Sequence, residues 1–106
     1  MLTDSLSAAA VNTAEERPVI KAGDYLNKLT GEHVEYECRR KLDAGAKEIV
    51  LDFRETELVN SIGISILLGI VDLAAARGAK IVCSDVKEET IELFEMLGVT
   101  KHVTLA

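Results

Sequence analysis

The chain has 106 residues, which is enough for one domain with a modest core and too few for a deep, multi-layered active site. Its formal net charge at pH 7 is −6, and its one compact basic cluster, residues 39–41, is flanked by Glu37 and Asp43. Because phosphate neutralisation supplies most of the affinity for nucleic acids, we expect neither a nucleic-acid partner nor binding to anionic membranes.

Residues 1–16 are polar and alanine-rich, and we expect an N-terminal edge strand or a partly ordered segment ahead of a domain spanning residues 17–106. They lack the basic region of a signal peptide, which favours a cytoplasmic protein. Residues 17–23 carry Pro18 near the start and Gly23 at the end, a pattern typical of a strand followed by a turn. The free edge of this early strand could pair with a second copy of the chain, giving a homodimer.

Residues 28–44 have the pattern of an amphipathic helix. An apolar residue recurs every four positions from Val34 to Leu42, with charged residues between. The candidate caps are Asn27 or Thr30 at the start and Gly45 at the end.

Residues 47–53 predict a central strand, because the continuous apolar run at residues 49–51 is typical of a strand covered on both faces. Residues 54–59 form a charged connector. An apolar helix is then expected from residue 60 or 61 to residue 77. Its longest apolar run, residues 62–71, is far too short to cross a bilayer, so we expect no membrane insertion.

Residues 80–83 predict another central strand. Asp85 and Glu88 have the spacing of a capping box and open a third helix that ends at Gly98. Residues 99–106 form a short C-terminal tail or strand. The apolar residues that this third helix is expected to bury are Ile91, Phe94 and Leu97.

Strands and helices therefore alternate along the chain. Such alternation implies right-handed crossovers and parallel neighbouring strands. The fold class is α/β: a single domain with a mostly parallel central sheet of about four strands and helices packed against it.

Two cysteines, Cys38 and Cys83, lie in different predicted elements and have no CxxC spacing. Only His33 and His102 could join them around a metal ion, without any recognised ligand spacing. We expect buried free thiols in a reducing compartment and no metal site.

Motifs for catalysis and for cofactor binding are missing: the sequence has no P-loop, no dinucleotide-binding glycine pattern and no nucleophile elbow. Asp24, Asp52 and Asp85 could converge at the strand ends around a cation, although loop and cap roles are commoner for such residues. We expect neither an enzyme nor a cofactor.

In an α/β domain, the binding site usually lies at the carboxyl ends of the strands. The richest segment there is residues 60–65, and Ser61 has two interpretations. As structure, its hydroxyl caps a helix, worth about 1 kcal/mol. As a switch, it accepts a phosphate that the helix N-terminus tolerates and that would repel a partner docked on the apolar residues beside it.

Three stretches together resemble the STAS domain family, over roughly residues 17 to 105. They are Gly-Asp-Tyr-Leu-Asn at residues 23–27, Asn-Ser-Ile-Gly-Ile-Ser at residues 60–65 and Phe-Glu-Met-Leu-Gly-Val at residues 94–99. The resemblance implies an anti-sigma factor antagonist, which binds an anti-sigma factor, often a serine kinase, and so releases a sigma factor. The docking residues it implies are Asp24, Tyr25, Asn27, Asn60, Ser61, Ile62, Gly63, Ile64 and Ser65.

The loop at residues 60–63 departs from the family's Asp-Ser-Ser/Thr-Gly pattern. Ile62 stands where the resemblance places the phosphorylated residue, and Asn60 replaces the aspartate. Ser61 is then the candidate phosphorylation site. Two alternatives stay open: a non-phosphorylated scaffold subunit of a signalling or transport complex, and a sensor that binds a nucleotide or another small ligand.

Overall fold

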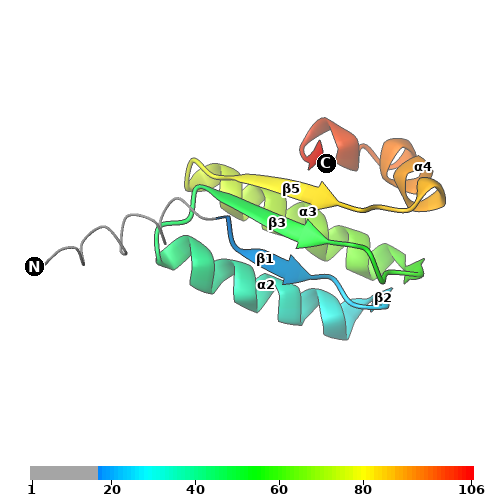
Figure 1. Cartoon of the computed structure of the whole chain (residues 1–106), viewed down its shortest axis with the longest axis horizontal. Helices are drawn as coiled ribbons and strands as arrows, with labels where there is room; N and C mark the ends of the chain where they lie inside the picture. Colours follow the sequence, from blue (N-terminus) through cyan, green and yellow to red (C-terminus); the bar gives the residue numbers. More distant parts are fainter. Residues whose placement is uncertain (1–16) are drawn as a thin grey trace, which may run out of the picture.

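Within residues 17–106, the central sheet has four strands, which are all parallel to their neighbours. In spatial order they are β1 (Val19–Lys21), β3 (Glu48–Asp52), β5 (Lys80–Ser84) and β6 (Thr104–Leu105). The helical connections are α2 (Lys28–Asp43), α3 (Ser61–Ala76), α4 (Glu88–Met96) and the short 3-10 helix η1 (Val99–Lys101). This computed structural model describes residues 17–106, so the expectation for residues 1–16 lies outside the described residues (Figure 1). The predicted α/β fold is confirmed.

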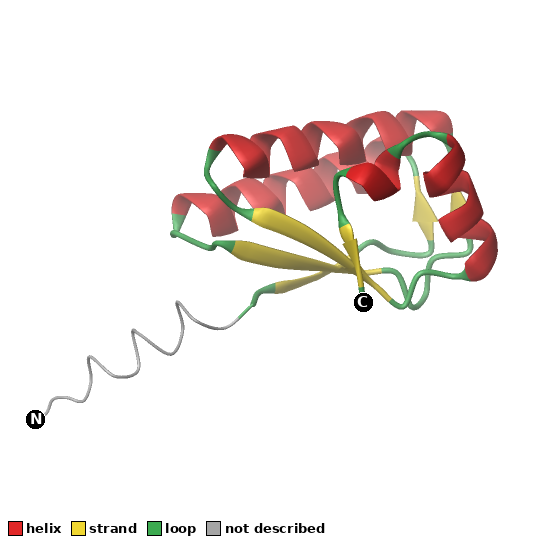
Figure 2. Ribbon diagram, turned by 90° about the horizontal axis from the view of Figure 1, so that it is seen from above, coloured by secondary structure: helices red, strands yellow, loops and turns green. Residues whose placement is uncertain are grey.

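The helices lie on one face of this sheet. Each connection between parallel strands steps to the next strand in the same direction, from β1 to β3, β5 and β6. Because such connections are right-handed, successive helices fall on the same side. Figure 2 shows the helices together above the strands, and no helix of residues 17–106 lies on the opposite face.

The core lies between the sheet and the helices. Phe53 and Phe94 are its largest side chains, and their rings meet edge to face with centroids 5.6 Å apart. Its strand residues alternate with residues that face the other way. The core residues from β3 and β5 are Ile49, Leu51, Ile81 and Cys83; those from α2 and α3 include Val34, Cys38, Leu67 and Ile70.

The helix predicted at residues 28–44 is observed at residues 28–43, and both of its candidate N-terminal caps take part. Asn27 is the N-cap, and its Oδ1 accepts a hydrogen bond from the amide of Thr30 at 3.1 Å. The Thr30 hydroxyl accepts in return from the amide of Asn27 at 2.9 Å. This reciprocal capping box fixes where the chain turns from β2 into α2.

The prediction for the start of α4 was wrong. Lys87 is the N-cap and makes no hydrogen bond with its side chain. Asp85 instead has a left-handed backbone with φ of 56°, and its carboxylate pairs with Arg54 at 3.2 Å. A long-range ion pair therefore replaces the local cap. Leu97, expected in the core, is 48% exposed and lies just past the end of α4 at Met96, whereas the next apolar residue, Val99, is buried.

The segment predicted as a connector at residues 54–59 contains a strand. Residues 58–59 form β4 (Leu58–Val59), which pairs in parallel with β2 (Tyr25–Leu26). Two residues per strand are too few to give an alternating pattern in the sequence. Among the helices of residues 17–106, none combines the length and the apolar character that a bilayer-spanning segment requires.

Candidate functional site

The small sheet of β2 and β4 brings together the two segments that the sequence singles out. Tyr25 lies opposite Leu58, and Leu26 lies opposite Val59. The amides of Glu57 and Leu58 both donate to the carbonyl of Asp24, at 2.8 and 3.2 Å. This sheet follows the carboxyl ends of β1 and β3, where an α/β fold commonly places its binding site.

The first turn of α3 is fixed against β2 by a glycine. A Cβ atom on Gly63 would collide with the carbonyl group of Leu26, so only glycine allows this approach. Asn60 caps the helix: its Oδ1 accepts from the amide of Gly63 at 2.8 Å. Its side-chain amide also donates to the Tyr25 hydroxyl at 3.3 Å. The start of α3 and the strand β2 therefore form one rigid unit.

Large apolar side chains are exposed on this unit. Tyr25 is 38% exposed, Leu58 61%, and Ile62, in the first turn of α3, 50%. Leu29, in the first turn of α2, is 77% exposed, and the Thr30 hydroxyl ties that turn to the Tyr25 carbonyl at 2.6 Å. We call these four residues, Tyr25, Leu29, Leu58 and Ile62, the apolar platform. Single exposed apolar residues are ordinary, whereas a group from adjoining elements is typical of a protein-binding surface.

The other predicted site residues surround or support the apolar platform. Asp24, Ser61 and Ser65 are exposed, and Ser61 is the first residue of α3. Asn27 and Asn60 are half-buried caps. Two residues that were predicted to contact a partner, Gly63 and Ile64, are buried beneath the surface.

Ser61 lies in a positive local field. A helix leaves its first amides without intrahelical acceptors, and α3 has 16 residues whose dipoles add at this end. The oxygens of Asn60 accept from the amides of Gly63 and Ile64. The amides of Ser61 and Ile62 then remain at the exposed end of the helix, where an anion is favoured.

The loop between β3 and β4 is anchored rather than free. Thr56 is 1% exposed, and its hydroxyl donates to the Gly23 carbonyl at 2.5 Å. The Lys87 ammonium donates to the carbonyls of Arg54 and Thr56, at 2.8 and 3.3 Å, and pairs with Glu57 at 3.4 Å. These bonds tie the loop to the turn after β1 and to the start of α4, so they hold Leu58 in place.

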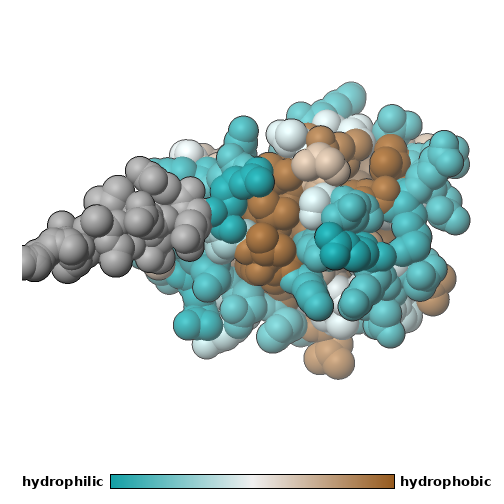
Figure 3. Space-filling view, viewed as in Figure 1, coloured by the Kyte–Doolittle hydropathy of each residue, from teal (hydrophilic) through white to brown (hydrophobic). Residues whose placement is uncertain are grey.

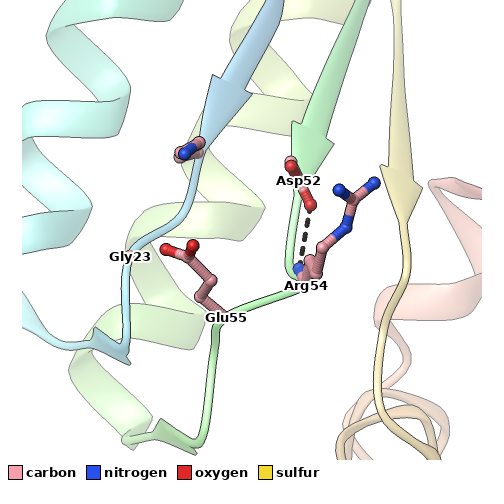
Figure 4. Close-up of a pocket in the computed structure, with 5 residues that line it drawn as sticks. Gly23, Asp52, Arg54 and Glu55 are labelled. Atoms are coloured by element: carbon pink, nitrogen blue, oxygen red, sulfur yellow. Dashed lines mark hydrogen bonds between the residues drawn. The ribbon is translucent and has the colours of Figure 1, made fainter.

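A shallow pocket opens beside this loop, and four of the five residues that line it are charged. Figure 4 shows Gly23, Asp52, Arg54 and Glu55 around it, and Lys21 completes the lining. Asp52 accepts from the Arg54 amide at 2.9 Å, and a hydrogen bond to Asp85 raises the pKa of the Arg54 guanidinium. Asp52 and Asp85 therefore stabilise the loop between β3 and β4.

Among residues 17–106, no three His, Cys, Asp or Glu side chains are grouped as a metal site requires.

The two cysteines are structural. Cys38 and Cys83 are both free and fully buried, which confirms the prediction of buried thiols. Burial raises the pKa of each thiol to about 12, and the nearby charges of Glu35 and Glu37 add to the effect at Cys38. Neither sulfur is a reactive thiolate at neutral pH.

Sequence reasoning missed Leu29 and Leu58. In the sequence, Leu29 resembles an ordinary residue of an amphipathic helix, and Leu58 lies in a charged stretch. Both become part of the surface only when β2 and β4 pair across 33 positions of the chain. A signal was nevertheless present for Leu29, because it is apolar and lies outside the four-residue spacing of Val34, Cys38 and Leu42.

The chain was also compared with models of known protein families. The model of the STAS domain family matches residues 8–106. No curated protein matches the chain. The family match thus covers the whole described structure and continues into the segment before it.

Proposed function

Because the chain belongs to the STAS domain family, whose members are generally binding and regulatory domains, we propose that it is an anti-sigma factor antagonist. It binds an anti-sigma factor, often a serine kinase in such systems, within a partner-switching pathway that regulates transcription. The family includes such antagonists and related proteins. The observation that carries the proposal is the apolar platform beside the exposed Ser61 at the start of α3.

The apolar platform is the docking surface, and the exposed Asp24, Ser61 and Ser65 form its polar rim together with the caps Asn27 and Asn60. Fully covering an exposed side chain of this size contributes about 1.5–3 kcal/mol. The four side chains of the apolar platform are only partly exposed, yet together they can supply several kcal/mol, about the contribution of an interface hot spot.

Phosphorylation of Ser61 is the switch in this proposal. A phosphate adds about −1.5 to −2 charges at pH 7. The helix N-terminus stabilises that charge within the domain, so the fold persists. The partner, in contrast, would have to bury the phosphate beside Ile62, which costs far more than the apolar contact returns.

A second candidate function is a non-phosphorylated scaffold subunit. It is favoured by Ile62, which is half-exposed at the position where the resemblance places the phosphorylated residue. An apolar side chain there strengthens docking and accepts no phosphate. The two candidates share the surface and differ only in whether Ser61 is modified.

Affinity capture from native lysate tests the proposal with four proteins: the wild type, Ser61→Glu, Ile62→Asp and Met96→Asp. Met96 is 80% exposed on α4 and serves as the matched control. We expect an anti-sigma protein with the wild type and the Met96 variant, and its loss with the other two. Retention by Ser61→Glu together with loss by Ile62→Asp favours the scaffold. Retention by all four contradicts the docking surface.

A further inference from the structure

The N-cap of α4 is occupied by a residue that the helix itself does not favour. Lys87 holds this position, and its side chain makes no hydrogen bond to the first turn. A cation at this end opposes the helix dipole, whereas Ser, Thr, Asp or Asn would satisfy a free amide. Departures from local preference are expected at functional or strained sites. The contacts of Lys87 indicate which part of the fold it serves.

The ammonium of Lys87 contacts the loop between β3 and β4, far away in the sequence. It donates to the carbonyls of Arg54 and Thr56, at 2.8 and 3.3 Å, and pairs with the Glu57 carboxylate at 3.4 Å. The Lys87 side chain is 34% exposed, so these contacts are partly shielded from water. Hydrogen bonds with a charged donor are stronger than neutral ones. Because Arg54 also pairs with Asp85, the connector between β5 and α4 holds the loop at two points.

These contacts lie immediately before Leu58 of the apolar platform. The Leu58 side chain is 61% exposed, so its own packing does not fix it. Its position depends on the backbone, because the amides of Glu57 and Leu58 both donate to the Asp24 carbonyl, at 2.8 and 3.2 Å. Figure 3 shows hydrophilic surface where the strands end beside this loop, so polar contacts hold it on this face. A change in the loop therefore moves Leu58 and its strand partner Tyr25.

We propose that Lys87 is a positioning residue of the docking surface, an inference that rests on the function proposed above. From the N-cap of α4 it holds the loop between β3 and β4, and through this loop it keeps Leu58 and Tyr25 in the arrangement that a partner meets. Lys87 itself lies outside the apolar platform. A surface that is ordered before binding loses less conformational freedom in the complex, which raises affinity. The capping interaction that α4 forgoes is thus exchanged for an ordered docking surface.

Amide hydrogen exchange of the free chain tests the positioning. Lys87→Met removes the ammonium and keeps an unbranched side chain. We expect the amides of Glu57 and Leu58 to exchange about tenfold faster, because loss of a charge-assisted hydrogen bond favours local opening of the loop. The amide of Val50, which donates to the Pro18 carbonyl at the other end of β3, should keep its wild-type rate. Equal acceleration of all three amides, or unchanged rates at Glu57 and Leu58, would overturn the proposal.

Three further variants separate positioning from charge and from helix capping. Lys47→Met removes the same charge just before β3, where the ammonium donates to the Arg77 carbonyl at 3.4 Å, and should leave exchange in the loop unchanged. Lys87→Arg keeps a cation with several donors and should retain slow exchange. Lys87→Asn supplies a favoured N-cap, so its urea midpoint should exceed that of Lys87→Met while the loop still exchanges fast. Wild-type exchange in Lys87→Asn would show that capping of α4 controls the loop, which contradicts the proposal.

Affinity capture from native lysate connects the position of the loop with docking. For Lys87→Met, the concentration of immobilised protein that retains half of the anti-sigma protein should rise about tenfold, and for Lys47→Met it should stay unchanged. Faster exchange in Lys87→Met with wild-type retention of this protein would overturn the role of Lys87 in docking. Capture of no anti-sigma protein by the wild type would instead contradict the proposed function, and the exchange rates would still decide whether Lys87 positions Leu58.

Discussion

Replacement by alanine should have opposite effects on stability at two glycines of α3. Gly63→Ala places a Cβ against the carbonyl group of Leu26, which is backbone and cannot rotate away. Gly69→Ala places a Cβ into open space on the exposed side of the same helix. The first substitution should push α3 from β2 and destabilise the domain, whereas the second should stabilise it.

The expected magnitudes follow from two opposing terms. Alanine is favoured over glycine inside a helix by about 1 kcal/mol, and this gain applies to both variants. Overpacking typically costs about 1–3 kcal/mol and more where backbone must move, and this cost applies only at Gly63. We therefore expect a net loss of up to about 2 kcal/mol for Gly63→Ala and a gain of about 0.5–1 kcal/mol for Gly69→Ala.

Urea unfolding of the two variants beside the wild type measures both values. In thermal unfolding, the midpoints should move in opposite directions by about 4–8 °C for each kcal/mol. Gly31→Ala gives an intermediate case, because its Cβ would meet the Ile66 side chain, which can adjust. If Gly63→Ala were as stable as Gly69→Ala, the close approach of α3 to β2, and with it the geometry of the apolar platform, would be refuted.

Further predictions concern the buried thiols, the loop and the helix cap. Because burial raises the pKa values of Cys38 and Cys83 to about 12, folding stability should be constant below pH about 8.5 and fall above it, by up to about 1.4 kcal/mol per pH unit for each thiol. Urea unfolding at pH 8 to 10 measures this slope, which should shrink when both are replaced by valine. Thr56→Val leaves the Gly23 carbonyl without its donor and should cost about 1–3 kcal/mol in chemical unfolding, and an unchanged midpoint would contradict the anchoring of the loop. Asn27→Ala removes the cap of α2 and should cost about 1 kcal/mol, whereas Asn27→Asp should retain most of it in the same assay.

Local signals in the sequence predicted most of the fold. Asn27 and Thr30 mark a helix start because a capping box needs only four consecutive residues. The strands at β3 and β5 are recognisable because their apolar runs are continuous. The same spacing argument was wrong at Asp85, where the carboxylate is used by Arg54, 31 positions away.

The candidate site was predictable only in part. The segments around Asp24 and Ser61 could be placed at the same edge of the sheet, because parallel strands end together. The pairing of Tyr25 with Leu58 could not be predicted, since it rests on strands of two residues. Ile64 was expected at the docking surface, but it is buried and belongs to the core.

The central claim is that the apolar platform is the surface on which a partner docks. Hydrogen exchange of the captured complex, compared with the free protein, tests this most directly. The account predicts that amides slow on binding in residues 24–29 and 57–65 and stay unchanged along α4. Slowing confined to α4, with residues 57–65 exchanging as in the free protein, would contradict it.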